Sequence, residues 1–477
     1  KLATEQENNL KFHYRMKNTD KKLKLTFYGG VGMVTGANFI LEKFEEINNE
    51  KNFKIMVDCG LIQGGKDKEK LNNEPFKYNP EEVDFLFVTH SHLDHIGRIP
   101  KLIKDGFRGK IYSNPATKDL SYLIFEDALK IMSYNSVEKD FLYSPEDVSK
   151  TITMWETIDY DVETKFNAGF SVLFKDAGHI LGSSIIEIKY EGKKIAFTGD
   201  LGNSPSPIIR DAKFVDGVDY IVMESVYGDR NHEGKETRKE KLKKIIQKTI
   251  EKKGTLLIPT FSVEKTQVIL SELNSLIENG DVESVPVFLD SPLAIKATEI
   301  YKKYTQYFNK ESKDAINSGD DIFNFPKLKL TKRREESENI KNAPNPKIIL
   351  AGSGMSMGGR VMSHEIEYLS EKSTTVLFIG FQVAGTLGRQ ILDGLKNVKI
   401  FDTEVEVKAD VESIFSYSSH KDSDHLLEFV EKSNNDKLKK VFVVMGELKA
   451  GLFFVQKIRD NLDIDAIYPE EGQSFEI

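Results

Sequence analysis

Hydrophobic residues along this chain fall into two patterns that predict different elements. Short runs of four or five apolar residues without polar alternation are typical of strands buried on both faces of a sheet. The segment 267–277 instead repeats hydrophobic residues every three or four positions, which predicts an amphipathic helix. Beyond about residue 206, strands and helices take turns, and this order indicates an α/β protein with a mostly parallel sheet covered on both faces. The expected strands lie at 23–28, 54–57, 84–88, 195–197, 220–223, 255–258, 285–289, 347–350, 375–379 and 441–444.

The strongest chemical signal directly follows one of these buried runs. The segment Thr89-His90-Ser91-His92-Leu93-Asp94-His95 places three imidazoles and a carboxylate within six positions. Open α/β sheets place their reactive groups in loops of this kind, at the carboxyl ends of strands. In a tight loop, His90 and His92 can point to one ion while Asp94 and His95 turn toward a second. Imidazole combined with carboxylate suits zinc or a similar divalent ion, so the sequence predicts a metal site here.

This cluster resembles the signature of the metallo-β-lactamase superfamily, whose fold is a four-layer αβ/βα sandwich with one or two metal ions at the sheet edge. The resemblance implies further ligands downstream. His179, after Gly178, matches the superfamily histidine that holds the first metal, and Asp200, after Gly199, matches the aspartate that bridges both metals. The resemblance also implies that Asp58 braces the metal-binding loop from outside the ligand set.

Further motifs resemble the β-CASP insertion, which defines a branch of the superfamily built from nucleases such as the endonuclease of pre-mRNA 3′-end cleavage and ribonuclease J. The resemblance implies a polar tail at 1–21, a metallo-β-lactamase domain at 22–208 and 396–477, and a β-CASP α/β domain at 209–395. The motifs are Glu224-Ser225-x-Tyr227-Gly228, Pro259-Thr260-Phe261-Ser262, Leu289-Asp290-Ser291-Pro292, Gly352-Ser353-Gly354-Met355 with Gly358-Gly359-Arg360, and Gly380-Phe381-Gln382 with Gly385-Thr386-Leu387-Gly388-Arg389.

Loops of the insertion are expected to line a groove for a single nucleic-acid strand. Backbone amides and arginine side chains in such loops suit phosphate groups. The residues expected to contact RNA phosphates are Ser353, Gly354, Arg360, Gly385, Thr386 and Arg389.

The segment Tyr417-Ser418-Ser419-His420-Lys421-Asp422 resembles the branch motif Phe-Ser-x-His-x-Asp, whose histidine protonates the leaving group. The resemblance implies that Glu224 supports His420 in this role. One position departs from the pattern, because Met445 precedes Gly446-Glu447 where relatives carry a histidine that completes the shell of the second metal. A thioether is a poor substitute for imidazole on zinc, so we expect the second ion to bind more weakly.

These assignments predict a zinc-dependent ribonuclease that hydrolyses phosphodiester bonds of single-stranded RNA as an endonuclease, with 5′-3′ exonuclease action left open. His90, His92 and His179 are assigned to one metal, Asp94 and His95 to the other, and Asp200 to both. The expected catalytic residues are Asp94, Asp200, Glu224 and His420, and the expected cofactor is one or two zinc ions, with manganese as an alternative.

Three other functions stay open at this point. A non-catalytic RNA-binding subunit fits the missing ligand at Met445. A hydrolase of small esters would share the metal motifs but would not need so long an insertion. DNA-specific relatives usually carry valine and RNA-specific relatives histidine where Met445 stands, so DNA remains an alternative substrate.

The composition limits the number of domains, the kinds of partner and the cellular compartment that we expect. The 477 residues suffice for two or three domains, and the formal charge of −8 argues against non-specific coating of nucleic acid while allowing a local basic groove. The single cysteine, Cys59, excludes an internal disulfide and favours a reducing cytoplasm. No apolar run approaches the length of a bilayer span, so no membrane partner is expected. A homodimer stays open.

Overall fold

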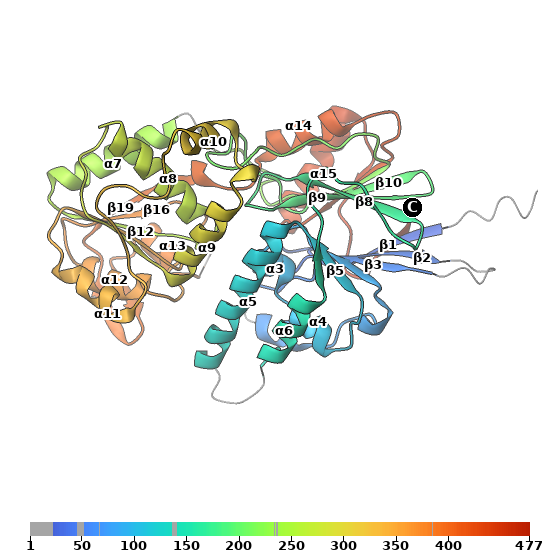
Figure 1. Ribbon diagram of the computed structural model, residues 1–477, viewed down its shortest axis with the longest axis horizontal. Helices are drawn as coiled ribbons and strands as arrows, with labels where there is room; N and C mark the ends of the chain where they lie inside the picture. The colour runs from blue at the N-terminus through green and yellow to red at the C-terminus, as the bar shows by residue number, and fades with distance from the viewer. Residues whose placement is uncertain are drawn as a thin grey trace, which may run out of the picture.

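The computed structural model describes residues 22–44, 52–65, 67–135, 141–232, 234, 237–383 and 385–477. These residues form two lobes that lie side by side (Figure 1). The sandwich lobe comprises residues 22–232 and 414–477, and the inserted lobe comprises residues 237–413. The expected polar tail, residues 1–21, lies outside the described residues. Among the described helices, none combines the length and apolar character needed to cross a bilayer.

Two seven-stranded sheets pack face to face in the sandwich lobe. In the first sheet the strand order is β22 (Ser474–Glu476), β1 (Lys22–Gly29), β2 (Asn38–Phe44), β3 (Lys54–Val57), β4 (Phe85–Phe87), β5 (Lys110–Ser113) and β6 (Trp155–Thr157). In the second it is β21 (Ala466–Ile467), β20 (Lys440–Val444), β11 (Tyr220–Glu224), β10 (Lys193–Phe197), β9 (Ser184–Tyr190), β8 (Phe170–Asp176) and β7 (Thr164–Lys165).

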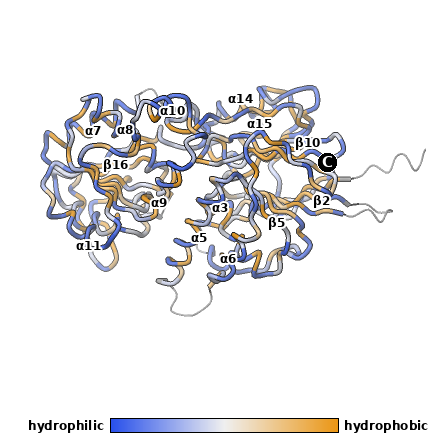
Figure 2. Tube along the Cα trace, in the orientation of Figure 1, coloured by the Kyte–Doolittle hydropathy of each residue, from blue (hydrophilic) through white to orange (hydrophobic). Residues whose placement is uncertain are grey.

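Aromatic side chains fill the space between these two sheets. Phe39 of β2 stacks on Phe197 of β10 with 6.3 Å between ring centroids, and Phe27 of β1 lies 5.3 Å from Phe442 of β20. All four rings are buried. Burial of large aromatic side chains supplies much of the apolar area that holds two sheets together. The hydrophobic residues accordingly concentrate on the strands in both lobes (Figure 2).

Helices cover the outer faces of the sandwich. Leu426 and Phe429 of α14 and Phe454 of α15 pack against Ile221 and Val441 of the second sheet. The resulting order of helix, sheet, sheet and helix confirms the predicted four-layer fold. On the first sheet lie α2 (Lys68–Asn73), α3 (Leu93–Ile96), α4 (Ile99–Lys104), α5 (Pro115–Asn135) and α6 (Pro145–Thr153), and on the second α14 (Ser423–Ser433) and α15 (Leu448–Leu462).

The inserted lobe is a six-stranded sheet in which every pairing is parallel. Its order is β14 (Leu328–Leu330), β13 (Val287–Asp290), β15 (Lys347–Ala351), β12 (Thr255–Pro259), β16 (Thr375–Phe378) and β19 (Asp410–Ser413). The antiparallel pair β17 (Asn397–Ile400) and β18 (Thr403–Glu406) lies beside it. The helices are α7 (Arg238–Glu251), α8 (Lys265–Glu278), α9 (Pro292–Lys303), α10 (Lys310–Asn317), α11 (Arg334–Glu338), α12 (Val361–Tyr368) and α13 (Leu387–Leu392).

The inserted lobe both begins and ends later in the chain than the range 209–395 that the sequence predicted. Strand β11 pairs with β10 and β20, so Tyr220–Glu224 belongs to the sandwich. Strand β19 pairs with β16, so the chain stays in the inserted lobe to Ser413. The apolar run of β11 gives no sign of which sheet it will join, because it pairs in parallel with both of its neighbours, as the strands of the inserted lobe also do.

Local sequence explains how several of these elements begin. Ser144 and Asp147 form a reciprocal capping box at the start of α6, with Pro145 in the first turn. Ser291 caps α9 in a similar way, because its hydroxyl accepts a hydrogen bond from the Ala294 amide. These caps fix the residue at which each helix begins, and α9 begins directly after β13, which ends in the polar side chain of Asp290.

Candidate metal centre

Four side chains converge where β4, β8 and β10 of the sandwich lobe end. His90 Nε2 lies 3.1 Å from His92 Nδ1, and His179 Nε2 lies 3.2 Å from the same atom. Asp200 Oδ2 lies 3.4 Å from both Nε2 atoms. Tetrahedral zinc with bonds of about 2.0–2.1 Å requires its ligand atoms to lie about 3.3 Å apart. These four separations match the spacing of ligand atoms around one zinc ion, and all four atoms lie within 4.8 Å of one another.

A second group shares Asp200 with the first. His95 Nε2 lies 3.3 Å from Asp200 Oδ1 and 3.8 Å from Asp94 Oδ2. Both His95 Nε2 and Asp200 Oδ1 are buried and, among the described residues, have no hydrogen-bond partner. Buried polar atoms are rarely left without a partner. Their orphaned state fits a shared metal ion, and Asp200 thus offers one oxygen to each group.

The local backbone explains why the ligands meet. His90 follows β4, whereas Asp94 and His95 sit in the short helix α3 that begins right after His92. Asp200 approaches because Gly199, with φ of +53°, passes against Thr89, whose side chain would lie 2.7 Å from an added Cβ. Only glycine accommodates both the left-handed backbone and this close approach.

A set of hydrogen bonds orients the histidines. The two oxygens of Asp58 accept from the Thr89 amide at 2.8 Å, the Thr89 hydroxyl at 2.7 Å and His95 Nδ1 at 2.7 Å. His179 Nδ1 donates to the Ser419 carbonyl at 3.1 Å. In each case the bonded Nδ1 leaves Nε2 to face the cluster, which is how outer partners fix a ligand tautomer. Asp58 thus lies where a bracing residue would be needed.

The pKa is lowered in the three histidines of the first group and raised in His95 of the second. Burial lowers the pKa of His90 and lowers those of His92 and His179 well below the usual value. Burial acts in the same direction on His95, but Asp200 and Asp58 outweigh it and raise its pKa well above the usual value. The first group therefore presents neutral imidazoles, the form that binds metal.

The structure brings Glu224 and His420 to the same place. His420 Nδ1 lies 3.2 Å from both Glu224 oxygens and 3.9 Å from Asp200 Oδ2. Glu224 ends β11, is fully buried, and also accepts from the Leu201 amide at 2.6 Å. Burial lowers the pKa of His420, but the Glu224 carboxylate outweighs it, so the pKa is raised. The Glu224 carboxylate thus favours the protonated form of an imidazole that lies beside the metal ligands.

Met445 follows β20, next to Glu224 in the sheet, since Glu224 pairs with Val444. It is buried, has a φ of +49°, and donates its amide to the Gly30 carbonyl at 2.6 Å. Its sulfur would lie 2.6 Å from a Cβ added to Gly30. The thioether therefore packs against the turn between β1 and β2. Ala37, the last residue of this turn, donates its amide to the carbonyl of Asp94.

Several residues expected to bind phosphate have other partners within the inserted lobe. Arg360 donates to Asp290 at 2.6 Å and to the carbonyls of Thr331 and Lys332. Arg389 pairs with Asp393, four residues along. The Arg360 charge is thus matched by a buried carboxylate, whereas Arg389 stays 39% exposed in its pair with Asp393, and neither arginine lies in the metal cluster.

The remaining residues of that set shape two loops of the inserted lobe. Ser353 accepts from the Met357 amide at 3.0 Å, and Thr386 caps α13 by accepting from the Arg389 amide at 3.2 Å. Gly354 lies against the Phe261 ring, and Gly385 has open space on its Cβ side. The loops are joined because Gln382 donates to the Gly354 carbonyl at 2.9 Å.

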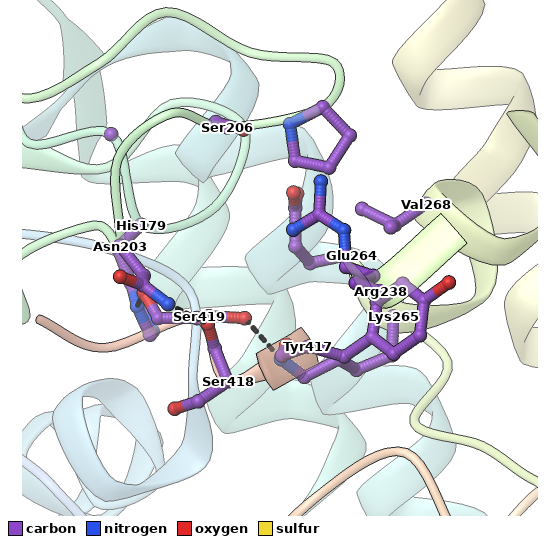
Figure 3. Close-up of a pocket in the computed structure, with 12 residues that line it drawn as sticks. His179, Asn203, Ser206, Arg238, Glu264, Lys265, Val268, Tyr417, Ser418 and Ser419 are labelled. Carbon is purple, nitrogen blue, oxygen red and sulfur yellow. Dashed lines mark hydrogen bonds between the residues drawn. The ribbon is translucent and has the colours of Figure 1, made fainter. Parts of the chain in front are cut away.

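A pocket between the lobes contains residues that the sequence did not single out (Figure 3). Lys265, in the first turn of α8, donates to the Tyr417 carbonyl and, at 2.7 Å, to the Ser419 hydroxyl. Asn203 donates to the Ser418 carbonyl at 3.0 Å. The inserted lobe thereby holds the segment that carries His420. Only the position of Lys265 after the motif Pro259-Thr260-Phe261-Ser262 could have drawn attention to it.

The four-layer sandwich with a histidine and aspartate cluster at its edge defines a metallo-hydrolase of the metallo-β-lactamase type. Family comparison agrees, since the Metallo-beta-lactamase superfamily matches residues 47–260, the Beta-Casp domain matches 266–391, and the Zn-dependent metallo-hydrolase RNA specificity domain matches 404–469. The chain belongs to the β-CASP branch of the metallo-β-lactamase superfamily, which confirms the resemblance drawn from its motifs.

Individual relatives cover most of the chain. A ribonuclease of Thermus thermophilus is 35% identical over 379 residues, which are 79% of this chain and 85% of the relative. Transcription termination factor FttA of Methanosarcina mazei is 30% identical over 95% of this chain and 72% of its own length. An RNase J-like protein of Methanocaldococcus jannaschii is 29% identical over 94% and 98%.

A solved structure, a protein of unknown function from Enterococcus faecalis V583, covers 96% of this chain and 100% of its own with a TM-score of 0.56. At 14% identity this likeness supports the fold alone.

Proposed function

We propose that this protein is a zinc-dependent ribonuclease that hydrolyses phosphodiester bonds of single-stranded RNA. The observation that carries the proposal is the shared carboxylate Asp200. One of its oxygens lies among His90, His92 and His179, and the other lies 3.3 Å from His95. Two such groups around one aspartate suit a pair of divalent ions, a recurrent arrangement in nucleases and phosphatases.

The residues fit zinc in the first group, where three neutral imidazoles and one carboxylate oxygen are held. In the second group Asp94, His95 and Asp200 supply three ligands. Bound ions would lower the pKa of water toward neutrality and stabilise negative charge on phosphate oxygens. Zinc in the first group and a weaker second ion, zinc or manganese, are therefore proposed.

The chain itself supplies the proton that a leaving oxygen needs. His420 is held by Glu224, which raises the pKa of the imidazole and so favours its protonated form. The 3.9 Å between His420 and Asp200 places this donor beside the ligands, where a scissile phosphate would lie. We assign His420 as the general acid, Glu224 as its orienting carboxylate, and Asp94 and Asp200 as ligands that position the nucleophile.

RNA is favoured as substrate because the residues of the inserted lobe border the catalytic side chains through Lys265 and the segment 417–419. The relatives named ribonuclease and RNase J-like match 79% and 94% of this chain, and the family matched at 404–469 is an RNA specificity domain. A small ester would not require this second lobe.

Cleavage of a 5′-labelled single-stranded RNA beside a DNA of the same sequence tests the proposal, with zinc measured in the same sample. We expect RNA to be cut faster, with at least one zinc ion per chain. His420→Gln should slow cleavage without releasing zinc, because His420 is not among the first four ligands. Faster DNA cleavage would replace RNA by DNA as the substrate, and RNA binding without cleavage by the zinc-loaded chain would indicate a binding subunit.

A further inference from the structure

An exposed aromatic residue lies at the junction of the lobes. Phe381 follows β16 of the inserted lobe and is 45% exposed, whereas most phenylalanines of the lobe are buried. The guanidinium of Arg230, from the sandwich lobe, lies 6.0 Å from the centre of the Phe381 ring and 5.4 Å from that of Tyr227. An exposed aromatic ring beside a guanidinium offers a flat apolar face next to a positive charge.

This pair lies next to the catalytic side chains. Tyr227 stacks at an angle on His420, with 6.1 Å between the ring centroids. His232, from the same segment as Arg230, packs on Tyr227 at 4.4 Å and contacts the His420 carbonyl at 2.9 Å. A continuous series of contacts therefore runs from His420 through Tyr227 and Arg230 to Phe381, across both lobes.

Arg230 retains charge to offer a ligand. Its only ion pair in the described part of the chain is with the neighbouring Asp229, at 3.5 Å. Its side chain is 50% exposed. In this it differs from Arg360, whose guanidinium binds a buried carboxylate and two carbonyls. Arginine suits phosphate because its planar group donates two parallel hydrogen bonds and can stay stacked on a ring.

We propose that Phe381 and Arg230 form a nucleotide-binding platform beside the metal centre, in which the Phe381 ring stacks on one base and Arg230 binds an adjacent phosphate. The proposal rests on the proposed function, because it assigns this surface to the single-stranded RNA substrate. Stacking needs no particular base, since every base has a flat face, and so the platform grips strands without selecting sequence. It replaces Arg360 and Arg389 as the expected phosphate contact.

Steady-state cleavage of an RNA oligonucleotide and of bis-p-nitrophenyl phosphate by the zinc-loaded protein tests the platform. Phe381→Leu should raise KM for RNA about tenfold, since stacking contributes about 1–3 kcal/mol per base. Hydrolysis of the small phosphodiester should stay within about twofold, because it has no flanking base to stack. Phe381→Trp should restore the RNA KM. Phe401→Leu is the matched control, because Phe401 is 62% exposed at the turn between β17 and β18 and should leave both activities unchanged.

Arg230→Gln provides a second, independent readout. It should lower the slope of log binding constant against log salt by about one, as expected for the loss of one phosphate contact. Binding can be followed by anisotropy of labelled RNA in the Asp200→Asn background, so the test does not depend on turnover. Equal losses for RNA and the small substrate, or an unchanged RNA KM in Phe381→Leu, would overturn the platform and leave Phe381 as an inter-lobe or protein contact. A wild-type protein that neither cuts nor binds RNA would instead overturn the proposed function.

Discussion

Two buried aspartates, one in each lobe, occupy similar positions and have opposite surroundings. Asp200 follows β10 of the sandwich lobe and Asp290 ends β13 of the inserted lobe. The Oδ1 atom of Asp200 has no hydrogen-bond partner among the described residues. Asp290 accepts from four side chains, those of Thr331, Ser337, Arg360 and His364.

The difference separates a functional carboxylate from a structural one. A buried charge whose hydrogen bonds are all made contributes to the stability of its lobe, whereas a buried oxygen left bare is costly unless something else binds it. The same contrast appears in the histidines, because His364 bonds Asp290 at 2.7 Å while Nε2 of His95 is unpartnered. In the metal centre two such unsatisfied atoms, His95 Nε2 and Asp200 Oδ1, face each other at 3.3 Å, as a shared ion would require.

The largest expected effect is on activity at Asp200. Asp200→Asn replaces one of the two oxygens, each of which faces one group, by an amide nitrogen that is a poor metal ligand. We therefore expect cleavage to fall by more than about 100-fold, beyond the loss caused by removing an outer partner of a metal ligand. Bound zinc, measured by atomic absorption, should fall in parallel. Thermal unfolding in the presence of chelator should change less than in Asp290→Asn. Turnover at the wild-type rate would contradict the shared-ligand role.

Asp290→Asn should act on stability instead. The substitution leaves the buried His364 and the partly exposed Arg360 without their carboxylate, and breaking a buried pair costs about 3–5 kcal/mol. Urea unfolding followed by circular dichroism measures this loss, while zinc content and kcat of the folded protein should remain unchanged. A loss of zinc at full stability would place Asp290 in the metal centre and remove the contrast between the two aspartates.

Met445→His tests the second group of metal ligands, to which Asp200 contributes one oxygen. An imidazole at this position would give the second ion a fourth ligand, and we expect its affinity to rise at least about tenfold. Titration of the metal-free protein with zinc, followed calorimetrically, resolves the second binding step. Met445→Leu is the control, since it keeps the packing against Gly30 without adding a ligand. An unchanged titration in Met445→His would mean that the side chain faces the Gly30 turn.

The smallest expected effect is on how the stability of the protein depends on pH. Burial would raise the pKa of Asp290, but its hydrogen bonds from His364, Ser337, Thr331 and Arg360 lower it from 3.8 to about 2. A carboxyl group whose pKa is lowered by folding stabilises the fold above its unfolded pKa and loses that contribution as pH falls through its folded value. The stability difference between wild type and Asp290→Asn should therefore be constant above about pH 4 and shrink toward pH 2. Urea midpoints measured across this range would show a flat difference if Asp290 titrated normally.

The sequence predicted the ligands better than their surroundings. His90, His92, Asp94 and His95 are neighbours in the chain, so a buried strand and a tight loop suffice to predict that they lie together. The pairing of Glu224 with His420 depends on residues 196 positions apart, and only the family resemblance brought them together. Spacing within a segment constrains local geometry, but not contacts between distant segments.

Arginine roles were the weakest part of the sequence interpretation. Arg360 lies in a glycine-rich motif that suits phosphate, yet Asp290, 70 positions earlier, binds it inside the lobe. Arg230 follows Gly228-Asp229 and shows no such motif, but its guanidinium stays exposed near His420 through Tyr227. Whether a cation is available to a ligand depends on which carboxylate reaches it in the folded chain, and this is a tertiary property. The same holds for Lys265, whose partners belong to the other lobe.

The pairing of β1 with β22 joins residues 24–26 to residues 474–476, and this has a consequence for synthesis on the ribosome. Chains fold from the amino end as they emerge, so all six proposed ligands are made before the inserted lobe. The proton donor His420 and the strands β20 and β22 come much later. A half-made chain therefore holds the six proposed ligands, but it lacks the edge strand of its first sheet and the proposed proton donor, so the first sheet and the site are completed only when the carboxyl-terminal segment has been made.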